Sequence, residues 1–399
     1  MRVLFLVQGE GRGHLTQAIS LAQLLREAGH TVVGALVGVT PGRPVPAFFS
    51  EAFSGDIEPV NSPGLVYSPK TNELLMLKTM LATMRQGRTF AKSIRQVRDA
   101  IDRYQPDLVV NFYELLGGLT YARYRPAVPM ICVAHQYLAF HPSFQFPAGK
   151  WLARCAFLGN SWLTSIGATE RLALSFDALP NVPEKRVRVV PPLLRREVTQ
   201  REPGVGNYWL AYLTQAGLAT RLVEAHHQHP EIPLRFFNPA TKAPDEVIDE
   251  TLTCHQIDGQ RFIDMMQNCQ AVVTTAGFES VCEAFYLGKP VLMMPQPNHY
   301  EQMCNALDGQ RAGVGVASDS LDFDALLNYL SQHDFQRNEY GPAIRFREWQ
   351  QQCSRVFLEA LEQAGQSKRN RTRSPNIFLS MKAIIRDYKN QPGLRQQPV

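Results

Sequence analysis

The sequence has no long uninterrupted hydrophobic segment. Its longest apolar runs, such as Val3–Val7 and Val291–Pro295, fall far short of the roughly 18–20 residues that a membrane-spanning helix needs. The N-terminus also lacks the long apolar region and the small-residue cleavage site of a secretory signal. We therefore expect a chain that does not cross a bilayer, and we predict a cytoplasmic location.

Cysteine is scarce, and its spacing fits no structural role. The seven cysteines are odd in number, scattered along the chain and never arranged as Cys-x-x-Cys. This spacing argues against a disulfide framework and against a zinc site. We expect reduced thiols within the core.

Acidic residues almost vanish from the end of the chain. The segment 366–399 contains eight basic residues and the single acid Asp387, so the excess positive charge of the chain (+5 overall) lies there. Such a basic tail suits a surface of anionic lipid or nucleic acid, although a solvated, disordered end explains it equally well. We expect no nucleic-acid partner.

The rest of the chain alternates between strand and helix patterns. Its 399 residues exceed the roughly 250–300 at which a single core stops growing, so two domains are expected. Short apolar runs recur between stretches with helical spacing, which is typical of parallel sheets covered by helices. A polar stretch rich in proline and glycine, from Pro191 to Asn207, separates two such series. The pattern predicts an α/β protein with a parallel sheet in each half.

These patterns define the expected boundaries. We predict an N-terminal domain over 1–195, a second domain over 196–345, a C-terminal helix over 346–365 and a basic tail over 366–399. The predicted strands are Val3–Val7, Thr31–Val37, Leu108–Asn111, Met130–Val133 and Val187–Val190 in the first domain, and Tyr208–Leu213, Leu234–Phe237, Ala271–Thr275 and Val291–Pro295 in the second.

The most informative stretch runs from Val272 to Gly315 and predicts a strand, a tight turn, a helix, a second strand and a second helix. Through Thr275 and Gly277 the first strand runs directly into a helix, which leaves backbone N–H groups unpaired at the positive end of the helix dipole. A diphosphate binds well at such a place. Gly277 permits close approach and Ser280 adds a hydroxyl, so we predict an anion-binding turn here.

Three further side chains are predicted to face the same crevice. Glu283 lies about a turn further on, where a carboxylate can accept both hydroxyls of a ribose. Glu301 and Gln302 begin the helix after the next strand and can accept hydrogen bonds from sugar hydroxyls. Each acid has a plainer interpretation, Glu283 as a solvated helix position and Glu301 as a helix-dipole partner. The order and spacing of the whole set are harder to explain by these plainer interpretations.

Other candidates carry less weight. Thr214 and Gly217 follow the first strand of the second domain and can add backbone donors to a diphosphate, although an ordinary turn explains them equally well. His135 follows another strand end and is predicted to line a cleft, with a polar loop as the alternative. Asp322 and Asp324 match Asp-x-Asp, but they begin a late helix and are interpreted as capping residues. No metal is expected, because helix dipoles and backbone donors can stabilise the negative charge of a departing diphosphate.

The first loop resembles a dinucleotide fingerprint only superficially. Its glycines over Gly9–Gly13 are spaced Gly-x-Gly-x-Gly, and no acid ends the second strand, so NAD is not expected. His14 follows at a helix start, where the dipole lowers its pKa and keeps the imidazole neutral, as a general base requires. A helix-cap or acceptor-binding role is the alternative. Glu114, just past a strand end, is predicted to orient His14, with a surface-loop acid as its alternative.

Together these motifs resemble the GT-B glycosyltransferases, in particular the UDP-glycosyltransferases of family 1 and the family 28 cell-wall and glycolipid enzymes. The resemblance is close over Thr275–Gly315, clear over Gly9–Ala18 and limited to general layout elsewhere. It implies two Rossmann-like domains facing each other across a cleft, with the acceptor facing Gly11 and Gly13. Where these families commonly have His-Gly, this chain has Thr275 followed by alanine, so a hydroxyl replaces one side-chain contact to phosphate.

By the same likeness, Gly277 and Ser280 meet the diphosphate, Glu283 the ribose, and Glu301 with Gln302 the transferred sugar. The expected reaction is a single in-line displacement from a UDP-sugar with inversion, in which the nucleotide sugar is a substrate and no cofactor takes part. The acceptor is expected to be a cell-envelope lipid, a saccharide or a small aglycone. A nucleotide-sugar epimerase of this fold and a non-catalytic nucleotide-sugar-binding protein remain alternatives.

The stretch Leu74–Arg103 combines apolar residues with a basic rim. This combination suits docking on an anionic membrane surface, so a peripheral membrane location is one prediction. A core-facing stripe with a solvated edge is the alternative, and it is slightly favoured.

Overall fold

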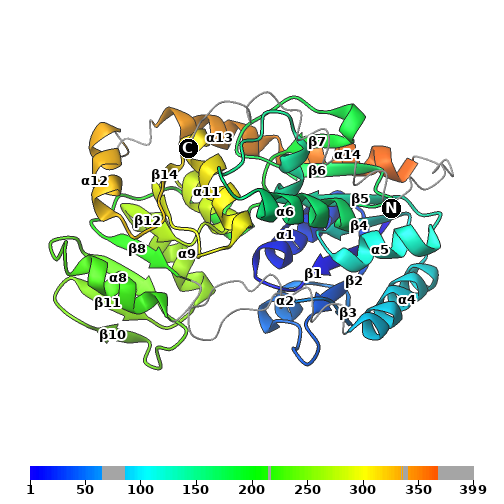
Figure 1. Cartoon of the computed structure of the whole chain (residues 1–399), viewed down its shortest axis with the longest axis horizontal. Helices are drawn as coiled ribbons and strands as arrows, with labels where there is room; N and C mark the ends of the chain where they lie inside the picture. The colour runs from blue at the N-terminus through cyan, green and yellow to red at the C-terminus, as the bar shows by residue number, and fades with distance from the viewer. Residues whose placement is uncertain (65–85, 214–216, 334, 336–339, 367–399) are drawn as a thin grey trace.

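The structure, a computed structural model, describes residues 1–64, 86–213, 217–333, 335 and 340–366. Figure 1 shows two α/β halves side by side, each built on one sheet. Within the described residues each sheet has seven strands. The alternating strand and helix patterns therefore predicted the fold class correctly.

The first sheet is entirely parallel, with the order β3-β2-β1-β4-β5-β6-β7. Its strands are β1 (Arg2–Gln8), β2 (Thr31–Val39), β3 (Asp56–Asn61), β4 (Leu108–Phe112), β5 (Met130–Ala134), β6 (Glu170–Leu174) and β7 (Val187–Val190). Strands β4 and β5 are buried throughout, as continuous apolar runs covered on both faces should be. The apolar pattern misses β3 and β6, because β3 is an edge strand with two acids and a proline, and β6 begins with two charged residues.

Helices cover both faces of this sheet. They are α1 (Gly13–Glu27), α2 (Ala47–Ala52), α4 (Gly87–Tyr104), α5 (Leu115–Tyr124) and α6 (Trp151–Thr164), with 3-10 turns η1 (His135–Phe140) and η2 (Pro183–Lys185). Helix α1 packs on β1 and β2 and places the first loop at the carboxyl end of β1.

The second sheet has the order β10-β11-β9-β8-β12-β13-β14, and only its edge strand β10 is antiparallel. Its strands are β8 (Trp209–Tyr212), β9 (Leu234–Phe237), β10 (Asp245–Val247), β11 (Leu252–His255), β12 (Ala271–Thr274), β13 (Val291–Met293) and β14 (Gly315–Ala317). The accompanying helices are α7 (Arg196–Thr199), α8 (Leu218–His226), α9 (Gly259–Asn268), α10 (Phe278–Tyr286), α11 (Tyr300–Ala312) and α12 (Phe323–Gln332). The short strands β10, β11 and β14 lack a clear apolar run, which is why the sequence pattern does not reveal them.

The helix predicted over 346–365 is two helices, α13 (Gly341–Gln351) and α14 (Cys353–Gln366). Helix α14 packs on β4, β5 and β7, so the chain returns to the first domain after completing the second (Figure 1). Phe357 and Leu361 are fully buried there. The C-terminal helix thus completes the core of the N-terminal half instead of standing apart. The basic tail beyond it lies outside the described residues.

An aromatic cluster joins the two halves. The ring of Phe176, which follows β6, lies 5.1 Å from Phe278 and 6.3 Å from Phe285 of α10, and 6.1 Å from Phe346 of α13. Burying such rings together contributes through both area and edge-on ring contacts. The two domains are therefore held by a packed contact as well as by the chain.

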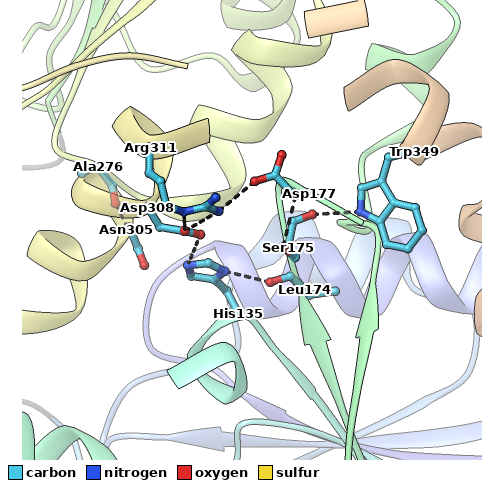
Figure 2. Close-up of polar contacts among 9 residues, drawn as sticks. All are labelled: His135, Leu174, Ser175, Asp177, Ala276, Asn305, Asp308, Arg311 and Trp349. Carbon is cyan, nitrogen blue, oxygen red and sulfur yellow. Dashed lines mark hydrogen bonds and ion pairs between the residues drawn. The ribbon is translucent and has the colours of Figure 1, made fainter. Parts of the chain in front are cut away.

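Polar contacts also join the two halves (Figure 2). Arg311 of α11 pairs with Asp177 at 2.8 Å and with Asp308 at 2.9 Å. Trp349 of α13 donates its indole N–H to the Ser175 carbonyl at 3.1 Å. These contacts hold α11 and α13 against the loop that follows β6.

Helix α4 forms the described part of the stretch that was predicted either to dock on a membrane or to face the core. Its apolar residues Phe90, Val97 and Ile101 are buried in the first domain, whereas Arg88 and Lys92 are exposed. This is the core-facing stripe with a solvated edge. Residues 74–85 lie outside the described part of the chain. No helix among the residues described combines the length and the apolar character that crossing a bilayer demands.

Candidate active site

A cavity of about 570 Å³ lies between the two domains, at the carboxyl ends of both sheets. The first domain contributes the loop after β1 and the start of α1. The second contributes the ends of β8 and β9 and the starts of α9, α10 and α11. Nine predicted site residues line it: Gly11, Gly13, His14, His135, Gly277, Ser280, Glu283, Glu301 and Gln302.

The turn between β12 and α10 has the geometry expected of an anion site. Gly277 is the N-cap residue, and a glycine has no side chain with which to cap the first N–H groups of α10. Ala276 holds a left-handed φ of 61°, which costs an alanine about 1–2 kcal/mol. Asn305 of α11 donates its side-chain amide to the Ala276 carbonyl at 3.0 Å and so secures the turn. Ser280 donates to the Gly277 carbonyl at 3.1 Å.

The carboxylate of Glu283 is fully engaged within the protein. Arg195, near the start of the interdomain linker, donates from Nε to Oε1 at 2.5 Å and from Nη2 to Oε2 at 2.6 Å. Glu283 is 1% exposed and both residues line the cavity. Its plainer interpretation as a solvated helix position is therefore wrong. The role of Glu283 as a ribose ligand stays a prediction, and both of its oxygens already accept from Arg195.

Glu279 is a second buried acid on α10, one turn before Glu283. Its Oε2 accepts a hydrogen bond from the Gln17 side chain of α1 at 3.0 Å, across the domain interface. Within the described structure its Oε1 has no hydrogen-bond partner. Burial, with the neighbouring charge of Glu283, raises the pKa of Glu279 to about 8. Sequence reasoning missed Glu279 and Gln17, although each lies at helical spacing from a predicted residue.

His14 lies in the first turn of α1 and is enclosed on several sides. Its Nδ1 is 3.3 Å from Gln17 Oε1 and its Nε2 is 3.5 Å from Gln136 Nε2. Its ring stacks on Tyr113 with centroids 5.6 Å apart. Burial lowers the pKa of His14 against the opposing effects of Glu301 and Gln17. The expected lowering is confirmed in direction, but burial is the main cause.

The prediction that Glu114 orients His14 is wrong. Glu114 is buried and caps α5, accepting from Leu116 N at 3.0 Å and from the Ser62 hydroxyl at 2.6 Å. Burial raises its pKa to about 7. The residue in contact with His14 at this strand end is Tyr113, whose φ of 58° turns it away from the strand direction. A short sequence motif cannot show which of two adjacent residues faces a partner.

The start of α11 supplies the expected polar groups. Glu301 and Gln302 both line the cavity, and Gln302 accepts from the Gln296 backbone N–H at 2.8 Å. His299 caps the helix by accepting from Gln302 N at 3.4 Å. The dipole partnership suggested for Glu301 is compatible with this position, one residue into the helix.

His135 lines the cavity but belongs mainly to the domain interface. Its Nδ1 donates to the Leu174 carbonyl at 2.8 Å, and its Nε2 lies 3.8 Å from Asp308 (Figure 2). Its ring stacks on Phe278 with centroids 4.0 Å apart. Burial lowers its pKa. The polar-loop interpretation is therefore wrong, and most of the ring is committed to packing.

The remaining candidates with described positions are not among the residues that line the cavity. Thr275 is 1% exposed and does not line it. Gly217 is the N-cap residue of α8 and does not line it either, while Thr214 lies outside the described residues. Asp322 caps α12 by accepting from Ala325 N at 2.9 Å, as predicted. Among the residues with described positions, no group of three or more His, Cys, Asp or Glu side chains is arranged to hold a metal ion.

A family model described as glycosyl transferase family 1 matches residues 1–333. An uncharacterized glycosyltransferase of Methanosarcina acetivorans is 24% identical over 337 residues, which cover 79% of this chain and 83% of that protein. A solved UDP-glucosyltransferase from Polygonum tinctorium, capable of glucosylating indoxyl, is 15% identical with a TM-score of 0.64, covering 92% of this chain and 99% of its own. The solved structure of MurG from Acinetobacter baumannii is 16% identical with a TM-score of 0.55. The match covers 91% of this chain and 99% of the MurG chain. At such identities the two structures show a shared fold.

Proposed function

The chain belongs to glycosyl transferase family 1 and is a glycosyltransferase of the GT-B fold, and from this premise we propose that it moves a sugar from a UDP-sugar to an acceptor hydroxyl. The observation that carries the proposal is the interdomain cavity, which is lined both by the start of α10 and by the enclosed imidazole of His14, whose pKa is lowered. We propose inversion at the anomeric carbon, because a single base serves a single displacement.

The donor is held by the second domain in this proposal. The N–H groups at the start of α10, beside Gly277 and Ser280, bind the diphosphate and stabilise the leaving charge. Glu283, shared with Arg195, accepts the ribose hydroxyls, and Glu301 with Gln302 contacts the sugar. The start of α10 offers charge stabilisation at this point, so we propose a reaction without a metal or a cofactor.

His14 is the proposed base. It takes the proton of the acceptor hydroxyl while that oxygen forms the new bond to the anomeric carbon and the nucleoside diphosphate leaves. An imidazole with a lowered pKa is unprotonated at neutral pH and can accept that proton. Enclosure by Tyr113 and Gln136 also limits the positions from which an acceptor can approach.

The acceptor is proposed to enter beside the first loop. A recess of about 340 Å³ lies there, lined by residues such as Gly11, Arg12, Arg43 and Phe48. Gly11, Arg12 and Arg43 line both this recess and the interdomain cavity, so the two are neighbours. The recess combines the Phe48 ring with two guanidinium groups and one acid, Glu10. Its excess of positive charge suits an acceptor with an apolar part and an anionic group, such as a phosphate-linked lipid. A small aglycone or a saccharide remains the other class.

A thermal-shift screen of UDP, GDP, UDP-glucose and UDP-N-acetylglucosamine tests the donor proposal. A nucleotide that binds the folded state at 100 times its Kd raises stability by about 2.7 kcal/mol. UDP and a UDP-sugar are expected to raise the melting temperature and GDP to do so less. If no nucleotide shifts it, the proposal fails. Incubating the stabilising UDP-sugar without acceptor then distinguishes slow hydrolysis, expected of a transferase, from formation of an isomer, expected of an epimerase.

A further inference from the structure

Glu279 lines the donor side of the cavity, yet its observed contact leads elsewhere. The carboxylate belongs to the second domain, but its hydrogen bond is to Gln17 of α1 in the first domain. Gln17 is also the neighbour of His14 Nδ1. Three side chains therefore form one chain of contacts from helix α10 to the proposed base.

The direction of these hydrogen bonds determines which ring nitrogen of His14 carries the proton. The Gln17 amide nitrogen donates to Glu279 Oε2, so the amide oxygen is turned toward His14. An oxygen can only accept, and His14 Nδ1 must therefore be the protonated nitrogen. This leaves a lone pair on Nε2. The amide nitrogen of Gln136, 3.5 Å from Nε2, is also consistent with an unprotonated acceptor at that position.

We propose that Glu279 is a positioning residue: acting through Gln17, it holds His14 with its Nε2 lone pair available to the acceptor, so that contact between the two domains prepares the base. The inference rests on the proposed function, since it needs His14 to be the base. It replaces the discarded role of Glu114 with an acid from the opposite domain. The base is then competent only when α10 and α1 are in contact, which couples donor-domain closure to catalysis.

The groups around Glu279 keep this carboxyl neutral at physiological pH. Burial raises the pKa of Glu279 most, and the charge of Glu283 on the same helix raises it further. The Gln17 hydrogen bond and the charge of Arg195 lower the pKa, but by less. The other titratable neighbours are the buried thiols of Cys282 on α10 and Cys353 on α14. A neutral carboxyl still accepts from the Gln17 amide, so the arrangement holds below about pH 8. Above it the ionised form accepts more strongly.

The test uses the full chain, UDP-glucose turnover and UDP binding. Glu279→Ala and Gln17→Ala are each expected to lower kcat about 10- to 100-fold, because a misplaced base loses activity of this order. UDP affinity is expected to change less than about threefold in both. Glu279→Gln is expected to restore most of kcat, since its amide oxygen also accepts from Gln17. The double variant should be no slower than either single one, because both changes break one chain of contacts.

A matched control separates positioning from general loosening of the interface. Asp177→Asn removes another interdomain ion pair, that with Arg311, without touching His14. It is expected to change kcat less than about threefold. Nitrogen-15 spectra of labelled histidine, assigned by the loss of one signal in His14→Ala, should show Nδ1 protonated in the wild type and mixed tautomers in Glu279→Ala.

Two results would overturn the inference and leave the proposed function intact. One is a double variant whose fold-loss of kcat equals the product of the losses in Gln17→Ala and Glu279→Ala. The other is a Glu279→Ala variant that loses UDP affinity while its kcat stays unchanged. If wild type neither binds UDP nor turns over UDP-glucose or UDP-N-acetylglucosamine, or if His14→Ala keeps full kcat, the proposed function itself fails. If Glu279→Ala does not fold, the tautomer of His14 is measured from the histidine spectra of Glu279→Gln and Gln17→Ala instead.

Discussion

Arg195 of the interdomain linker and Glu283 of α10 form a two-pronged ion pair at 2.5 and 2.6 Å, and Glu283 is almost completely buried. A guanidinium matches a carboxylate in this geometry and satisfies both oxygens. The pair ties the first part of the linker to the helix that begins at the proposed diphosphate site. Glu283 therefore lines the cavity with its carboxylate already paired to a cation.

The first prediction concerns the stability that this pair provides. Arg195→Ala leaves a buried carboxylate without its partner and should lower the free energy of unfolding by about 3–5 kcal/mol. Arg195→Met combined with Glu283→Leu removes both charges and should recover most of that loss. Urea unfolding of the three proteins measures it. Equal destabilisation by the single and double changes would show that the packing, and not the charge pair, matters.

The second prediction follows from the two buried acids with raised pKa. Glu279 and Glu114 titrate near pH 8 and 7 in the folded protein, against 4.5 for an ordinary glutamate. Between pH 4.5 and the raised pKa of each group, the folded state holds a proton that the unfolded state has released, so the free energy of unfolding falls as pH rises. Each group contributes a slope of at most about 1.4 kcal/mol per pH unit. Glu279→Gln and Glu114→Gln should each flatten the fall in unfolding free energy between pH 5 and 8, measured by urea titration at several pH values. An unchanged slope would contradict the burial of these groups.

The third prediction separates His14 from Glu114. His14→Ala should lower kcat with UDP-glucose by about 100- to 10,000-fold, the usual contribution of a general base, while UDP affinity measured by calorimetry stays within about threefold. Glu114→Gln should keep kcat within about threefold, because its contacts go to Ser62 and Leu116. A loss in Glu114→Gln as large as that in His14→Ala would restore Glu114 as the partner of the base.

The fourth prediction concerns the strained turn at Ala276. Asn305 donates to its carbonyl, and Asn305→Ala should leave that buried carbonyl without this donor and release the turn. A lost hydrogen bond of about 1–1.5 kcal/mol corresponds to roughly tenfold weaker UDP binding. Calorimetry measures the change. Asn268→Ala is the control, because the exposed Asn268 side chain donates to the Asp264 carbonyl of its own helix α9. Equal weakening in both variants would assign the effect to the domain as a whole.

The alternation of strands and helices could be predicted from the sequence wherever a strand is a buried apolar run, because apolar runs and helical spacing are local consequences of burial. The edge and short strands β3, β6, β10, β11 and β14 lack such a run and were missed. The turn before α10 and the loop that carries His14 could also be predicted, since each joins a strand directly to a helix. Strand ends of parallel sheets meet at one edge, so the predicted residues of each domain were expected to share one side. Nine of them do line one cavity.

What the sequence could not decide is which side chains meet across the two domains. Gln17 and Glu279 are 262 positions apart, and no local pattern places them together. Arg195 and Glu283 form a pair because the linker passes beside α10, and Glu114 turns to Ser62 because Tyr113 takes the place beside His14. Pattern and propensity act over a few residues, whereas these partnerships depend on the packing of one domain on another. The local elements were therefore determined by the sequence alone, and the partners of the proposed base by tertiary structure.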